Sequence, residues 1–160
     1  MRDLLFEKKV CYKSGLKATE IEEKLTALVK SKDAAGDRFA GKVYSSKFSL
    51  TPILGSRQNF KITMLGDVRE DTDTMVEITY TVSSVLKAVV YGAFIGYLGL
   101  SLLLKLIGFN LTLNGIEHFD YYLVATAVAF LIISKLTFTS QCSYYSEFIR
   151  KFLRLKAIEG

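Results

Sequence analysis

Residues 88–104 read AVVYGAFIGYLGLSLLL and lie between Lys87 and Lys105 with no charge among them. As an α-helix this stretch would extend about 26 Å, close to the ~30 Å hydrocarbon core of a bilayer. The flanking lysines can reach the headgroups with their ammonium groups, and apolar residues continue beyond Lys105. The sequence therefore predicts a transmembrane helix over about residues 86–108.

A second apolar block, YYLVATAVAFLIISKLTF at residues 121–138, has one charge, Lys135, near its end. It predicts a second span over about residues 120–138, so that the two form a transmembrane hairpin within residues 84–141. The alternative is a buried helical hairpin in a soluble protein. That interpretation is weaker because a domain of residues 1–83 has too little surface to cover two such helices.

Charge is divided unevenly along the chain. Residues 1–83 contain 14 Lys and Arg and 12 Asp and Glu, whereas residues 84–146 contain three Lys and two acids. This division excludes an ordinary soluble enzyme with one large core. The composition also excludes a disulfide scaffold and a disordered chain.

Basic residues near the span ends predict how the hairpin is inserted. The loop between the spans has no Lys or Arg, while the N-terminal domain and the tail contain many. We therefore expect an integral membrane protein with both termini cytoplasmic, although Lys105 at the outer end counts against this orientation. The first ten residues lack the apolar core of a signal peptide. The residues expected at the membrane interfaces are Lys87, Lys105, Tyr121, Tyr122, Lys135, Tyr144, Tyr145, Arg150, Lys151 and Arg154.

Both apolar blocks carry small residues at four-residue spacing. Such rows let helix backbones approach closely, where dispersion and weak C–H···O contacts add up. The glycine row could pack against the alanine row within one chain, which is the simpler interpretation, or against another copy in an oligomer. The predicted packing residues are Ala88, Gly92, Gly96, Gly99, Ala125 and Ala129.

Residues 1–83 predict a small cytoplasmic α+β domain. Thr19 and Glu22 have the spacing of a capping box, and Ile21, Leu25 and Leu28 follow at helical spacing, which predicts one helix over residues 19–30. Apolar and polar residues alternate after Arg38, which is typical of a small antiparallel sheet. The expected strands lie near residues 39–44, 48–52, 60–65 and 76–82, with a further candidate near 5–12.

Residues 142–160 predict a short, separate amphipathic helix with a basic face. Tyr145, Ile149 and Phe152 fall on one side at helical spacing, and Arg150 and Arg154 fall opposite. Such a helix can lie on anionic headgroups or dock on the soluble domain, and the sequence favours neither.

Catalytic chemistry has little support in the sequence. One histidine, His118, cannot form a histidine cluster, and Cys11 and Cys142 are expected to stay reduced in the cytoplasm. No phosphate-binding loop, nucleophile elbow or zinc-protease motif occurs. We therefore expect no enzymatic activity, no catalytic residues, no cofactor and no metal site. Bases mixed with acids also argue against nucleic-acid binding.

Several short motifs in the N-terminal domain occur in an order that is similar to that of a known group of proteins. Phe39, Gly41 and Phe48 form F-x-G-x6-F, followed by Gly66 and by a T-x-V-x-I strand that starts at Thr74. Their order, followed by two spans, resembles uncharacterised small bacterial two-span membrane proteins with an F-x-G…G…T-x-V-x-I cytoplasmic domain. Members often have a proline shortly before the second glycine, where this chain has apolar residues. The resemblance implies an architecture and carries over no activity or site residue.

These features predict a non-enzymatic integral membrane protein. Its cytoplasmic domain is expected to bind a ligand or partner and to couple that event to an oligomerising two-helix membrane unit, as a bacterial defence or stress effector would. The alternatives are an accessory subunit of a larger membrane complex, or an immunity protein against a membrane-active toxin. The expected partners are the lipid bilayer and either a second copy or another membrane protein. A small ligand, not identified by the sequence, is a further candidate.

Overall fold

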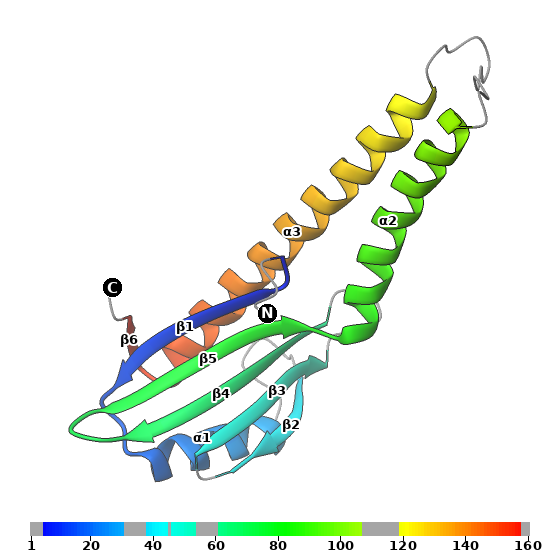
Figure 1. Ribbon diagram of the computed structural model, residues 1–160. Helices are drawn as coiled ribbons and strands as arrows, with labels where there is room; N and C mark the ends of the chain where they lie inside the picture. Colours follow the sequence, from blue (N-terminus) through cyan, green and yellow to red (C-terminus); the bar gives the residue numbers. More distant parts are fainter. Residues whose placement is uncertain (1–4, 31–37, 45, 54–60, 107–118, 158–160) are drawn as a thin grey trace. The chain divides into compact units, whose positions relative to one another are not determined.

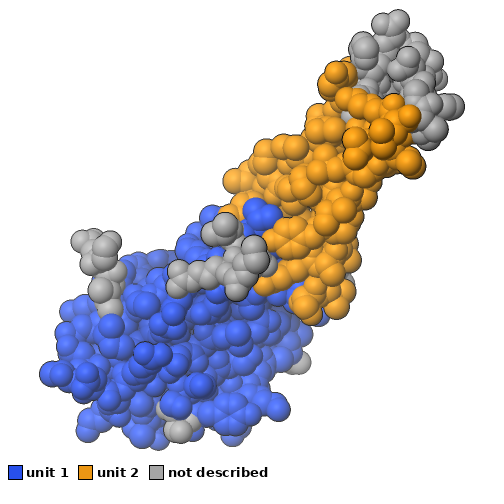
Figure 2. Space-filling model, viewed as in Figure 1, with its two compact units in different colours: residues 1–83, 138–160 blue, residues 84–137 orange. Residues whose placement is uncertain are grey.

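The computed structural model describes residues 5–30, 38–44, 46–53, 61–106 and 119–157 (Figure 1). The chain forms two compact units, one of residues 1–83 with 138–160 and one of residues 84–137 (Figure 2). The C-terminal segment thus belongs to the same unit as the N-terminal domain, and we call the two parts unit 1 and unit 2.

Unit 1 contains an antiparallel six-stranded sheet in the order β2-β3-β4-β5-β1-β6 (Figure 1). The predicted α+β class is confirmed, including the candidate first strand. The last strand, which pairs with the end of β1, is too short for its alternation to be recognised in the sequence. The strands are β1 (Glu7–Ser14), β2 (Arg38–Val43), β3 (Lys47–Ile53), β4 (Ile62–Glu70), β5 (Thr74–Val82) and β6 (Leu155–Ala157).

Helix α1 (Ala18–Lys30) matches the predicted helix, and Ile21, Leu25 and Leu28 are its buried residues. The predicted N-cap at Thr19 is wrong, because the helix begins one residue before it. The carboxylate of Glu20 instead accepts a hydrogen bond of 3.2 Å from the backbone N–H of Lys17, the residue that caps the helix. This is the carboxylate half of a capping box, placed two residues earlier than the sequence suggested.

One face of the sheet is covered and the other is open. In β5, Val76, Ile78 and Tyr80 are fully buried, while Thr79 between them is partly exposed. The same alternation runs through β4, where Ile62 is buried. The side chains at the positions between these buried residues therefore face solvent, as in antiparallel sheets with a helical layer on one side.

Helix α3 (Phe119–Phe152) is a single helix of 34 residues. The separate C-terminal helix predicted for the tail is wrong, because its residues continue α3. The predicted apolar face is real and docks on the sheet, where Phe39 of β2 stacks on Phe148 with ring centroids 5.4 Å apart. Arg154, with φ 52°, then turns the chain into β6. The docked side chains are Phe138, Cys142, Tyr145, Ile149 and Leu153.

Unit 2 consists of helix α2 (Ser84–Leu106) and the α3 residues up to position 137. By length and composition α2 and the part of α3 from Tyr121 are long and apolar enough to cross a membrane. The predicted loop between the spans lies largely outside the described residues, as does His118.

Candidate functional site

The small-residue rows of unit 2 face outward. A Cβ atom added at Gly92, Gly96 or Gly99 would meet no described atom within 4 Å beyond its own helix and chain neighbours. Ala125 and Ala129 are exposed as well, and so is Ala88 on the glycine side. In this structure the glycine row therefore does not pack on the alanine row of the same chain.

Other residues of unit 2 are the buried ones. Among the described residues of α2 these are Val90 and Ser101, and in the same unit Ala127 and Ser134 of α3. On α2 these two positions lie about 160–180° round the helix from Gly92, at 100° per residue. The glycine row therefore occupies the opposite side of α2 and remains available for a different neighbour.

The predicted interface residues fall in two groups. In unit 2, the ammonium of Lys105 lies 4.8 Å from the ring centroid of Tyr121, a cation–π contact that joins the end of α2 to the beginning of α3. Tyr122 is exposed, and Lys87 and Lys135 are half-buried.

The second group lies on the docked half of α3. Tyr144 is exposed, but Tyr145 is buried and packs edge-on against Phe39 at 6.3 Å, so it is not available to an interface. Arg150 lies twelve residues beyond Phe138, about 18 Å along the helix. That distance exceeds a Debye length of ~8 Å. Headgroups at the end of the predicted span would therefore attract this cation weakly.

Two of these cations have a partner on their own helix. Arg150 and Lys151 lie 2.9 and 3.3 Å from a carboxylate oxygen of Glu147. The hydrogen bonds from Arg150 and Lys151 lower the pKa of the Glu147 carboxyl. Arg154, the third predicted tail cation, is exposed next to β6.

A polar cluster lies in the contact between the sheet and α3. The hydroxyls of Tyr12 and Ser146 are 2.5 Å apart, beside the buried Tyr80. Burial raises the pKa of the Tyr80 phenol, whose hydroxyl lies close to those of Tyr12 and Ser146. The three hydroxyls thus form a polar contact between β1, β5 and α3 within an otherwise apolar core.

The open sheet face carries a shallow groove of about 230 Å³. On this face Asp67 of β4 is paired directly with Glu77 of β5. Like charges in that position repel each other, and Lys9 offsets this by approaching Glu77 to 2.7 Å. The side chains that line the groove from this face and its tip are Cys11, Asp67, Arg69, Asp71, Met75 and Glu77.

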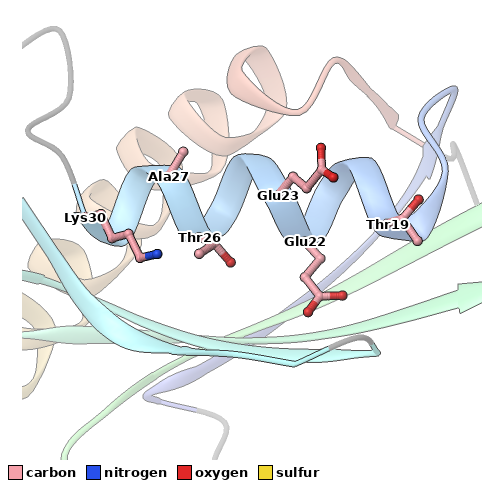
Figure 3. Close-up of a pocket in the computed structure, with 6 residues that line it drawn as sticks. All are labelled: Thr19, Glu22, Glu23, Thr26, Ala27 and Lys30. Carbon is pink, nitrogen blue, oxygen red and sulfur yellow. The ribbon is translucent and has the colours of Figure 1, made fainter.

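A second groove, of about 590 Å³, runs along the outer side of α1 (Figure 3). Its described lining comes from one helix and includes both acids and a cation, Lys30. In Figure 3, Glu22 and Glu23 project to different sides of α1. The other lining residues are Thr19, Thr26 and Ala27.

The described residues contain no group of His, Cys, Asp and Glu that could hold a metal ion. Neither groove was predicted from the sequence, because no motif marks the residues that line it. The signal that could have indicated the first was the alternation that places Asp67 and Arg69 of one strand beside Met75 and Glu77 of the next. Comparison with protein-family models, curated proteins and solved structures found no match.

Proposed function

We propose that this chain is a non-enzymatic integral membrane protein of a bacterial inner membrane, with both termini cytoplasmic. In this proposal unit 1 binds a ligand or partner, and unit 2 spans the membrane and oligomerises. Binding to unit 1 then changes how the spans associate.

The observation that carries the proposal is the absence of a linker between the sheet and either apolar helix. Strand β5 ends at Val82 and α2 begins at Ser84, so one residue joins them. Helix α3 contributes to both units without interruption. A rearrangement of the sheet therefore has two short routes to the spans.

Membrane insertion is supported by how little of the apolar helices is buried. Within the most apolar 18-residue windows of α2 and α3, 11% and 17% of the residues are buried. A core helix of a soluble protein would be mostly buried, and an exposed apolar surface of this extent requires a lipid or protein environment.

Orientation can be tested with the exposed thiol of Cys11, because the other cysteine, Cys142, is buried. In intact cells stripped of their outer membrane, a membrane-impermeant maleimide should leave Cys11 unlabelled. After the inner membrane is opened, it should label Cys11 and fail to label a Cys11→Ser variant. Labelling of Cys11 in intact cells would overturn the cytoplasmic assignment.

Oligomerisation through the outward glycine row can be tested by Gly92→Leu and Gly96→Leu. A leucine side chain blocks close backbone approach, so we expect at least a tenfold weaker association, which corresponds to about 1.4 kcal/mol. The measurement is the mass of the nanodisc-embedded protein after cross-linking in the native membrane.

The matched control is Ala93→Leu, which adds a similar side chain about 100° round α2 from Gly92. It should leave the oligomer intact. A monomeric wild type, or a fixed complex with a different protein, would argue against the self-associating unit and favour an accessory subunit or an immunity protein.

A further inference from the structure

Charge is separated between the two sides of unit 1. The described strand residues on the open face include three acids, Glu7, Asp67 and Glu77, all of which are partly exposed. Six cations whose side chains are described lie on the same face and outnumber these strand acids, and three of them pair with acids: Lys9 with Glu77, Lys13 with Asp73 and Arg69 with Asp67. The cations are all exposed and are Lys9, Lys13, Lys42, Lys47, Arg69 and Lys156.

Helix α1 has the opposite balance. Its 13 residues contain three glutamates and two lysines, a net charge of −1. The buried residues of α1 are all apolar, so its charged side chains lie on the outer side and flanks of the helix. The glutamates are Glu20, Glu22 and Glu23, near the N-terminal end, whereas Lys30 ends the helix.

The open face also offers apolar contact. Leu65 and Met75 are 45% and 38% exposed on this face, and Met75 lines its groove. On the outer side of α1, Ala27 is exposed between polar neighbours and lines the second groove. Each surface therefore combines charge with a small apolar area, as the rim and centre of a protein interface do.

Neither surface is used by the connections to unit 2. Within unit 1, Phe138 contacts Phe6 edge-on at 5.9 Å, just before β1. The first residue of β1, Glu7, pairs with Thr81, next to the end of β5. Both connections thus leave from one end of the sheet, while the groove residues Asp71 and Met75 lie at the other end.

We propose that the open sheet face of one copy of this chain docks on the outer side of α1 in a second copy. The proposal rests on the self-association proposed above and specifies a contact for it. The two patches differ, so the contact is head-to-tail and leaves one free patch of each kind on every dimer. Copies inserted in the same orientation can therefore extend the contact into a ring or a row.

The chemistry of the open face favours a second copy of the chain over a single-stranded nucleic acid or an anionic bilayer as its partner. One described aromatic side chain, Tyr44, is exposed beside Lys47 at the edge of the open face, whereas single-stranded nucleic acids need a series of such stacking platforms. An anionic bilayer would meet Asp67 and Glu77 at the centre of the face. The α1 surface fits better, because Lys30 can approach this acid pair while Glu22 and Glu23 meet the surrounding cations.

Thiol cross-linking tests the contact, because Cys11 is already exposed on the open face. In full-length protein in its native membrane, Glu23→Cys should give dimers and larger species with a short bis-maleimide reagent. Adding Cys11→Ser should remove them. A control thiol at Ser140→Cys, exposed on α3, should cross-link at least fivefold less.

Charge reversal tests the same contact in the Glu23→Cys background. Lys42→Glu with Lys156→Glu should lower the cross-linking yield at least fivefold, and Glu20→Lys with Glu22→Lys should do the same. A mixture of these two double variants should restore the ladder of cross-linked species, because each reversed patch then meets its complement on the other variant. Both reversals in one chain should restore it as well.

The outcomes separate this inference from the proposed function. An intact oligomer in which Cys11 does not cross-link to the thiol introduced by Glu23→Cys would overturn the face-to-helix contact and leave association through the spans standing. Cross-links that appear only with anionic lipid would do the same. A ladder that persists in Gly92→Leu would support the face-to-helix contact and show that the spans are not its source. Purified monomer without cross-links would overturn both proposals.

Discussion

Ser143→Pro is expected to release the C-terminal half of α3 from the sheet. Ser143 is exposed and lies well inside the helix, so its side chain is not part of the docked face. Proline at this position removes one helical hydrogen bond, and its ring collides with the carbonyl of Thr139. The cost is about 3 kcal/mol or more. Tyr145 and Ile149, which follow in the docked face, lose the straight helix that positions them.

The buried thiol of Cys142 reports this release. In a Cys11→Ser background it is the single thiol of the chain, and its side chain is fully buried on the docked face. When labelling requires undocking, its rate follows the population of the undocked state. A loss of 3 kcal/mol should therefore raise the maleimide labelling rate roughly a hundredfold, at 1.36 kcal/mol per factor of ten.

Ser143→Ala is the matched control, because it removes the hydroxyl that bonds the carbonyl of Thr139 at 3.0 Å but keeps the helix. It should label within about twofold of the parent. If the proline variant labelled as slowly as the alanine variant, α3 would not be held by continuity of its helix, and the argument for coupling through α3 would fail. If undocking also changed the oligomer mass, the coupling argument would gain direct support.

The strands of unit 1 could be predicted because their burial alternates with a period of two. Their limits were less certain, and β4 is the clearest case. The sequence suggested a strand near residues 60–65, but β4 runs from Ile62 to Glu70. The alternation of apolar and polar residues is interrupted at Gly66, Asp67 and Arg69, so the sequence does not show that the strand continues. These residues belong to β4 because their backbones pair with the neighbouring strands β3 and β5.

The end of the chain could not be predicted, for a different physical reason. An amphipathic pattern shows that a helix has an apolar face but not what covers it. Here the cover is the sheet, and the side chain that receives Tyr145 and Phe148 is Phe39, more than a hundred positions earlier in the chain. The three-residue β6 depends entirely on pairing with β1.

The kinds of residue that form the candidate sites could be predicted from the sequence. The side of the helix or sheet on which they lie relative to their neighbours could not. The spacing of Gly92 and Gly96 indicated a row on one side of a helix, but spacing cannot tell which side faces α3. The charge of the open face was equally hidden, because Lys9 and Lys156 come from opposite ends of the chain and meet on the same face through β1 and β6.

Gly66→Ala should destabilise unit 1 by about 2–3 kcal/mol, the upper range for inserting a methyl group into a packed core. Gly66 is paired with Phe48 across β3 and β4. A Cβ at Gly66 would lie 2.1 Å from atoms of the Phe48 ring, which is 3% exposed, so the ring would have to shift within the core. In a domain of this size the melting temperature should fall by roughly 8–24 °C, at 4–8 °C per kcal/mol.

Gly92→Ala is the internal control, because its added methyl group meets no described atom within 4 Å. It should leave unit 1 unchanged and favour the helix by up to about 1 kcal/mol. Phe48→Leu should lessen the effect of Gly66→Ala, so that the double variant is more stable than the sum of the single changes implies. Heating the purified protein while following the exposure of Cys142 measures all four variants. An unchanged melting temperature for Gly66→Ala would show that Phe48 can move. The expected drop would instead explain why Phe48, the second aromatic of F-x-G-x6-F, occurs together with Gly66: its ring needs the space above that glycine, and no ligand is required to account for either residue.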